Sequence, residues 1–119
     1  MDKKLISQIV VFYTLILILL SIVPVPDLGL PKFKLLELDK LIHFIMYLIL
    51  AMIWGLKIEN FSKRKIETSI YLILFGLGLE ILQHVLPFGR CFDLGDFVVN
   101  SIGVLFGVFI LYYLKKKLL

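Results

Sequence analysis

The stretch of sequence richest in groups that could do chemistry is "EILQHVLPFGRCFDLGDFVVNSIG", residues 80–103. It places acids, amides, a histidine and an arginine between apolar runs, where polar groups are expensive to bury. A second polar set precedes it: Asp39, His43 and Tyr47 follow at i, i+4 and i+8 and would share one helix face, with Lys40 one step round. Such groups can bind anions, ligate metal ions or exchange protons.

The elements that must position these residues are apolar helices. Hydrophobic residues make up 61% of the 119 residues, and the mean hydropathy is +1.01, well above an ordinary soluble domain. Four segments approach the roughly 17–25 residues that a spanning helix needs: residues 6–23, 41–56, 69–86 and 97–114. We therefore expect an all-α fold, a four-helix transmembrane bundle forming a single domain over residues 1–119.

The connections between these segments carry fewer signals. Residues 24–39 contain three of the four prolines, so we expect an irregular or interfacial segment, with the next helix starting near Leu38. Residues 57–68 form a short basic connection, with Ser62 or Thr68 available to cap the third helix.

Basic residues predict the orientation of the bundle. Nine of the 13 lysines and arginines flank the two ends of the chain and the second connection. The other four, Lys32, Lys34, Lys40 and Arg90, lie in or directly beside the first and third connections. The positive-inside bias then places both termini in the cytoplasm. The first span begins with lysines, as a secretory signal does, but no A-x-A pattern follows it, so we expect an uncleaved helix.

Polar residues on the last three helices are expected to converge at one level. Glu80 lies six positions before Leu86, about 9 Å below the outer boundary at 1.5 Å per residue. The predicted outward-facing pocket lies beneath Arg90, a cation suited to carboxylates or to a ligand's phosphate. Its candidate residues are Asp39, Lys40, His43, Tyr47, Glu80, Gln83, Arg90, Asp93, Asp96 and Asn100. Gly103 and Gly107 form a G-x-x-x-G pair that permits close helix packing.

Each group also has a structural interpretation. Glu80, Gln83 and Asn100 could form an interhelical hydrogen-bond network, and Asp93 and Asp96 could cap the fourth helix. His43 and His84 could bind a metal with Glu80 and an aspartate, but neither belongs to a metal-binding histidine pair, so we expect no metal and no cofactor. The single cysteine, Cys91, excludes an intrachain disulfide.

The segments "DKLIHFIMYLIL" and "GLGLEILQHVLPFGRCFDLGDFVVNSIGVLFG" resemble the VanZ-like family of small bacterial integral membrane proteins. The family pattern is D-K-x-x-H-F-x-x-Y, then E-x-x-Q, an arginine in the next loop, and D-x-x-x-N-x-x-G-x-x-x-G. It falls in this chain on Asp39, Lys40, His43, Phe44, Tyr47, Glu80, Gln83, Arg90, Asp96, Asn100, Gly103 and Gly107. The resemblance covers nearly the whole chain after the first span.

The resemblance implies a multi-pass protein of the bacterial cell membrane with a role in teicoplanin resistance or envelope homeostasis, and it names no reaction. One hypothesis is that the pocket binds an amphipathic envelope molecule, a lipid-linked cell-wall precursor or a lipoglycopeptide. The expected partners are then membrane lipids and such molecules, and not nucleic acid. The alternative is an intramembrane enzyme acting on lipid-linked phosphate intermediates, with Glu80 or Asp96 as general base, His43 as acid or base, and Arg90 stabilising the transferred group. A transporter is disfavoured because no inverted repeat is visible.

Overall fold

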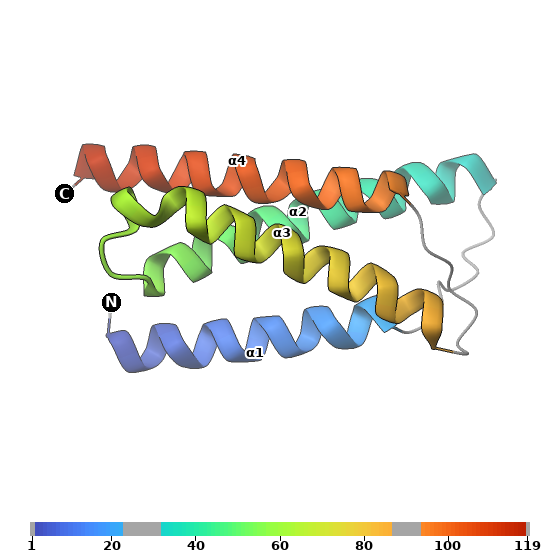
Figure 1. Ribbon diagram of the computed structural model, residues 1–119, viewed down its shortest axis with the longest axis horizontal. Coiled ribbons are helices and arrows are strands. Elements are labelled where there is room, and N and C mark those ends of the chain that lie inside the picture. Colours follow the sequence, from blue (N-terminus) through green and yellow to red (C-terminus); the bar gives the residue numbers. More distant parts are fainter. Residues whose placement is uncertain (1, 23–31, 87–93, 119) are drawn as a thin grey trace.

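Long apolar helices make up almost all of the described chain. The structure, a computed structural model, describes residues 2–22, 32–86 and 94–118, without the side chains of residues 32–37 and 118. Its helices are α1 Lys3–Ile22, α2 Lys32–Lys57, α3 Phe61–Val85 and α4 Leu94–Leu118. They lie along the long axis of an up-and-down bundle of 46 × 24 × 23 Å, and α1 begins at the same end where α4 finishes (Figure 1).

All four helices are long and apolar enough to cross a membrane. Their outer faces carry exposed large hydrophobic side chains, among them Phe12, Ile45, Ile66 and Phe109. Such a surface would be unfavourable in water but matches the hydrocarbon of a bilayer. The prediction of an all-helical fold with four helices long and apolar enough to span a membrane is confirmed.

The first predicted connection is shorter than expected because α2 begins at Lys32 and not near Leu38. Residues 32–54 contain neither proline nor glycine, and residues 32–40 are rich in lysine and leucine, which favour helix. The three prolines therefore interrupt only the segment before Lys32, and the part of the prediction that made residues 32–37 irregular is wrong.

The second predicted connection is also shorter, since α3 begins at Phe61. Ser62 and Thr68 lie inside the helix, so the prediction that one of them caps it is wrong. The N-cap is Asn60, with left-handed backbone angles of φ 55° and ψ 42°, a conformation that asparagine adopts more readily than most residues. Its carbonyl accepts hydrogen bonds from the backbone amides of Lys63 and Arg64 at 3.0 and 3.1 Å.

The closest packing in the bundle lies between α2 and α4. A Cβ atom added to Gly103 would lie 2.5 Å from the carbonyl oxygen of Phe44, and one added to Gly107 would lie 2.3 Å from that of Leu48. The two helix backbones therefore touch where only hydrogen atoms fit between them. Phe44 and Phe106 pack edge to face on the same pair, with ring centroids 5.8 Å apart.

Helix α1 is attached to α2 by polar contacts inside the span. The Tyr13 hydroxyl donates to the carbonyl of Met46 at 2.7 Å, and the Trp54 indole nitrogen donates to the Thr14 hydroxyl at 3.2 Å. In an apolar medium such bonds satisfy groups that have no access to water. These two hydrogen bonds therefore attach α1, whose outer face is almost wholly apolar, to α2.

Lysines gather at the end of the bundle where the first residues of α1 and the last of α4 lie (Figure 1). The ammonium groups of Lys57, Lys65, Lys115 and Lys117 lie over the rings of Trp54, Tyr112, Phe61 and Tyr113, at 5.4, 4.7, 5.2 and 5.7 Å from the ring centroids. Lysine and aromatic side chains of this kind are typical of a membrane–water interface. The opposite end holds the acidic and amide groups analysed below.

Replacing Gly107 by alanine should destabilise the protein, because the new methyl group would overlap the backbone of α2. We expect a loss of about 1–3 kcal/mol in the free energy of unfolding, the usual effect of overpacking. The matched control is Gly78→Ala on α3, where an added Cβ atom meets nothing within 4 Å. Thermal unfolding in detergent should show a lower midpoint for Gly107→Ala alone, and equal midpoints for the two variants would contradict the packing described.

Candidate functional site

Five polar side chains of α2 and α4 face one another inside the span. We call Asp39, Lys40, His43, Asp96 and Asn100 the α2–α4 polar cluster. Asp39 and His43 are one turn apart on α2, and Asp96 and Asn100 are one turn apart on α4. Two one-turn pairs on adjacent helices that run in the same direction therefore meet at the end of the bundle away from the lysines (Figure 1).

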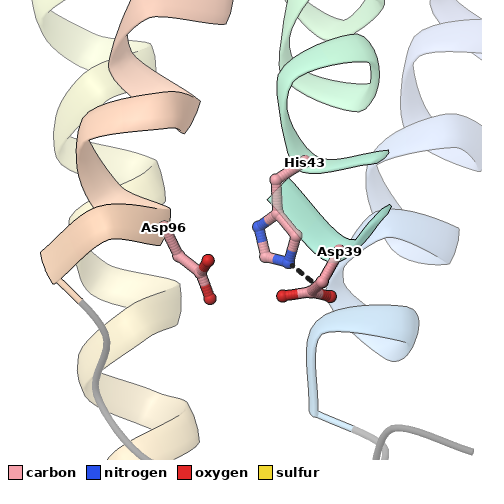
Figure 2. Close-up of side chains that lie close together, drawn as sticks. All are labelled: Asp39, His43 and Asp96. Atoms are coloured by element: carbon pink, nitrogen blue, oxygen red, sulfur yellow. Dashed lines mark ion pairs between the residues drawn. The ribbon is translucent and has the colours of Figure 1, made fainter. Parts of the chain in front are cut away.

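Direct contacts join the members of this cluster. Lys40 Nζ donates to Asp96 Oδ1 at 3.0 Å, across the two helices. His43 Nδ1 lies 3.0 Å from Asn100 Oδ1, and His43 Nε2 lies 3.4 Å from Asp39 Oδ1. Figure 2 shows the imidazole of His43 between the two aspartates, with its ion pair to Asp39 dashed.

Burial makes this cluster electrostatically demanding. The side chain of Asp96 is 6% exposed and that of His43 is 10% exposed, whereas those of Asp39 and Lys40 are 24% and 35% exposed. An ionised carboxylate out of water needs a cation and hydrogen bonds. Lys40 supplies the cation for Asp96, and the position of Asp96 in the first turn of α4 adds the favourable end of the helix dipole.

Asn100 has one polar atom without a partner. Asn100 is 2% exposed, and its Nδ2 atom has no hydrogen-bond partner in the described part of the chain. Leaving a buried donor unsatisfied costs about 1–3 kcal/mol. The amide that contacts His43 thus still has two N–H groups to offer an acceptor.

The remaining predicted site residues lie on other helix pairs. Gln83, 2% exposed, donates from Nε2 to the backbone carbonyl of Ser21 and ties α3 to α1. Glu80 is 1% exposed and close enough to Tyr47 to act on it electrostatically. The ring of Tyr47 in turn lies against Gly76 of α3, 3.1 Å from where a Cβ atom would be.

Other predicted site residues lie outside the described part of the chain or away from the α2–α4 polar cluster. Arg90 and Asp93 lie outside the described residues, as does Cys91. His84 is exposed near the end of α3. Among the described residues, the histidines and acids close enough to share one metal ion are Asp39, His43 and Asp96, with ligand atoms within 4.8 Å of one another. This set does not include His84, which the metal alternative had paired with His43.

Ser21 is a buried polar residue that the sequence interpretation missed. It is 8% exposed, and its hydroxyl donates to the carbonyl of Leu17 at 2.7 Å. A serine that follows the apolar run of residues 15–20 was the available signal, because an intrahelical hydroxyl bond lets serine lie in a membrane helix. Its role as the acceptor for Gln83 uses a backbone carbonyl, which no sequence pattern marks.

A separate apolar groove of about 290 Å³ lies on the α1, α2 and α3 side of the bundle, lined by Thr14, Trp54, Tyr71 and Phe75 among others. Its lining residues are distinct from the α2–α4 polar cluster. The groove could hold an acyl chain or a side chain, but it offers little polar chemistry.

The fold and the cluster define a multi-pass, all-helical membrane protein with buried charged groups inside its span. The VanZ/LLP1 family profile matches residues 3–116, nearly the whole chain, and the protein belongs to this family. No curated protein and no solved structure gives a match. The family assignment agrees with the resemblance seen in the sequence.

Removing the lysine of the Lys40–Asp96 pair should be more harmful than removing the pair. Lys40→Met leaves a buried carboxylate without this cation, and we expect a loss of up to about 3 kcal/mol in unfolding free energy. The double variant Lys40→Met/Asp96→Asn should recover most of that loss, since the amide carries no charge. Unfolding of the four proteins of this double-mutant cycle in detergent measures the coupling, and strictly additive effects would show that the pair contributes nothing.

Proposed function

We propose that this protein is a bacterial cell-membrane protein that binds the polar head of an amphipathic envelope molecule at the α2–α4 polar cluster. The ligand is a lipid-linked cell-wall precursor or a lipoglycopeptide. The observation that carries the proposal is a buried cluster of mixed charge with a partly exposed ammonium group, Lys40, and an unsatisfied amide donor on Asn100. Ionisable groups inside a membrane span are candidate functional sites by default.

The chemistry of the cluster favours a phosphate or carboxylate headgroup. The Lys40 ammonium and the Asn100 amide are hydrogen-bond donors, and charge-assisted bonds to anionic oxygens are the strong ones. Exposed apolar residues flank the cluster on both helices, including Leu41 and Ile42 on α2 and Leu94 and Val98 on α4. A ligand with an anionic head and a hydrocarbon chain satisfies both surfaces.

The proposed orientation places the cluster toward the outside of the cell. The lysine-rich end, with both ends of the described chain, would then face the cytoplasm by the positive-inside bias. Lipid-linked cell-wall precursors and glycopeptide antibiotics are encountered at the outer surface. Under the family's link to teicoplanin, which carries a lipid chain, the same site would take up a lipoglycopeptide.

A second candidate function is an enzyme acting on lipid-linked phosphate. It is favoured by the position of His43 between two carboxylates, which suits a general acid or base (Figure 2). Glu80 and Arg90 were the other residues assigned to this chemistry. Glu80 is buried near Tyr47, and Arg90 lies outside the described residues.

Lys40→Gln should weaken binding of a polyprenyl pyrophosphate about 10- to 100-fold, the equivalent of one charged hydrogen bond of about 1.5–3 kcal/mol. Binding is measured on the purified protein, with the uncharged polyprenol as the ligand control. Lys116→Gln, an exposed lysine at the opposite end of the bundle, is the control variant. Equal affinities for the two lipids would contradict the proposal. Release of phosphate in the same samples, lost in His43→Gln, would favour the enzyme.

Expression of the chain in a Gram-positive host should raise the concentration of teicoplanin, but not of vancomycin, that stops growth. Lys40→Gln at a matched membrane level should lose this protection, because the anionic head of the ligand loses its cation, while Lys116→Gln should keep it. If the wild-type chain leaves both susceptibilities unchanged, the resistance role is wrong for this protein and binding of endogenous envelope lipids is the part of the proposal that stands.

A further inference from the structure

We infer that Asp39, His43 and Asp96 form a binding site for one divalent transition-metal ion, of the zinc or manganese type. The inference concerns the same cluster as the proposed function and adds a resident cation to it. It does not depend on a lipid ligand, because metal binding can be measured without one.

The first argument is the hydrogen bonding of His43. Its Nδ1 lies 3.0 Å from Asn100 Oδ1, an acceptor, so that nitrogen carries a proton. The other nitrogen, Nε2, faces the Asp39 carboxylate, which is also only an acceptor. A neutral imidazole cannot donate from both nitrogens, so a second positive species must lie at Nε2, either a proton or a metal ion.

The second argument is that this is the usual setting of a metal-binding histidine. Such a histidine donates its other ring N–H to an oxygen acceptor, which fixes the ring and directs the ligating nitrogen at the metal. Asn100 Oδ1 provides that acceptor, 3.0 Å from His43 Nδ1. His43 therefore has the supporting hydrogen bond that is typical of a metal-ligating imidazole.

Distances allow one ion to reach all three side chains. The Nε2 of His43 and the Oδ1 of Asp39 are 3.4 Å apart. Two ligand atoms at about 2.1 Å from a tetrahedral ion are themselves about 3.4 Å apart. One ligand atom each of Asp39, His43 and Asp96 lies within 4.8 Å of the other two, so a small rotation of the Asp96 side chain would complete the site. Figure 2 shows the Asp96 carboxylate on the far side of the imidazole from α2.

The chemistry of the donors selects the ion. One imidazole and two carboxylates suit zinc, manganese or ferrous iron better than a thiolate-seeking metal. Three protein ligands leave a coordination position open for water or an anion.

Lys40 does not exclude the ion. It donates to Asp96 Oδ1, and a carboxylate has a second oxygen through which it can bind metal. The positive charge of Lys40 nevertheless repels a nearby metal ion and so lowers the affinity of the site for it. An ion and a lysine beside one carboxylate together make a strong site for a phosphate oxygen.

The test uses full-length protein purified in detergent without a histidine tag, stripped with EDTA, and titrated with Zn²⁺ by calorimetry and with Mn²⁺ by electron paramagnetic resonance. The wild type is expected to bind one ion per chain. His43→Gln should weaken binding at least about 100-fold. Asn100→Ala should weaken it about 10- to 100-fold, the usual effect of removing the hydrogen bond that orients a ligating histidine. The matched control is His84→Gln, which removes the only other histidine and should bind as the wild type does.

Two further variants keep the result decisive. Asp39→Asn removes the more exposed carboxylate and should also weaken metal binding. This variant provides the test if His43→Gln does not fold. Lys40→Met removes a like charge and should tighten binding about tenfold, an effect that a purely structural ion pair would not produce. Absence of stoichiometric binding by the wild type overturns the inference and assigns a proton to Nε2. Equal losses in His43→Gln and His84→Gln overturn it as well. Failure of the lipid-binding experiment leaves it untouched.

Discussion

The contact between two glycines of α4 and the backbone of α2 is the constraint on which the polar cluster depends. Gly103 and Gly107 bring the helices so close that the carbonyl groups of Phe44 and Leu48 fill the space of a side chain. Within one turn of this contact, Asn100 reaches His43, and one turn further Asp96 reaches Lys40. A wider helix separation would open both hydrogen bonds, since each spans only 3.0 Å.

Charge within an apolar surrounding explains why the cluster has this composition. A single buried carboxylate would be costly, but a lysine, an imidazole and an amide arranged around two carboxylates divide the charge among several short contacts. The lysines at the opposite end do not share this requirement, because they lie over aromatic rings at the predicted interface. Both ends of the bundle are therefore polar, but only the α2–α4 polar cluster is buried.

Hydropathy predicted the number and type of the helices because bilayer-spanning length is a property of the chain alone. Spacing likewise placed Asp39 with His43, and Asp96 with Asn100, since a one-turn separation depends only on helix geometry. The spacing could not predict which neighbouring helix each polar face contacts. The expected single pocket included Gln83, but its amide contacts Ser21 on α1, because the rotation of α3 is set by packing with three neighbours. Helix starts at Lys32 and Phe61 were missed because charged residues outside the apolar core still favour helix.

A rigid helix pair also limits what the cluster can accept. Where backbones are in contact, side chains cannot move apart to admit a bulky group, so the buried part of the cluster suits a single ion or one oxygen of a larger ligand. The more exposed side, formed by Lys40 and Asp39, is where the rest of a headgroup could lie. Because the backbone contact fixes the two helices, such a ligand would require only side-chain rotations within the cluster. The glycines that bring α2 and α4 together thus determine both the strength of the cluster's internal contacts and the size of the group that can enter it.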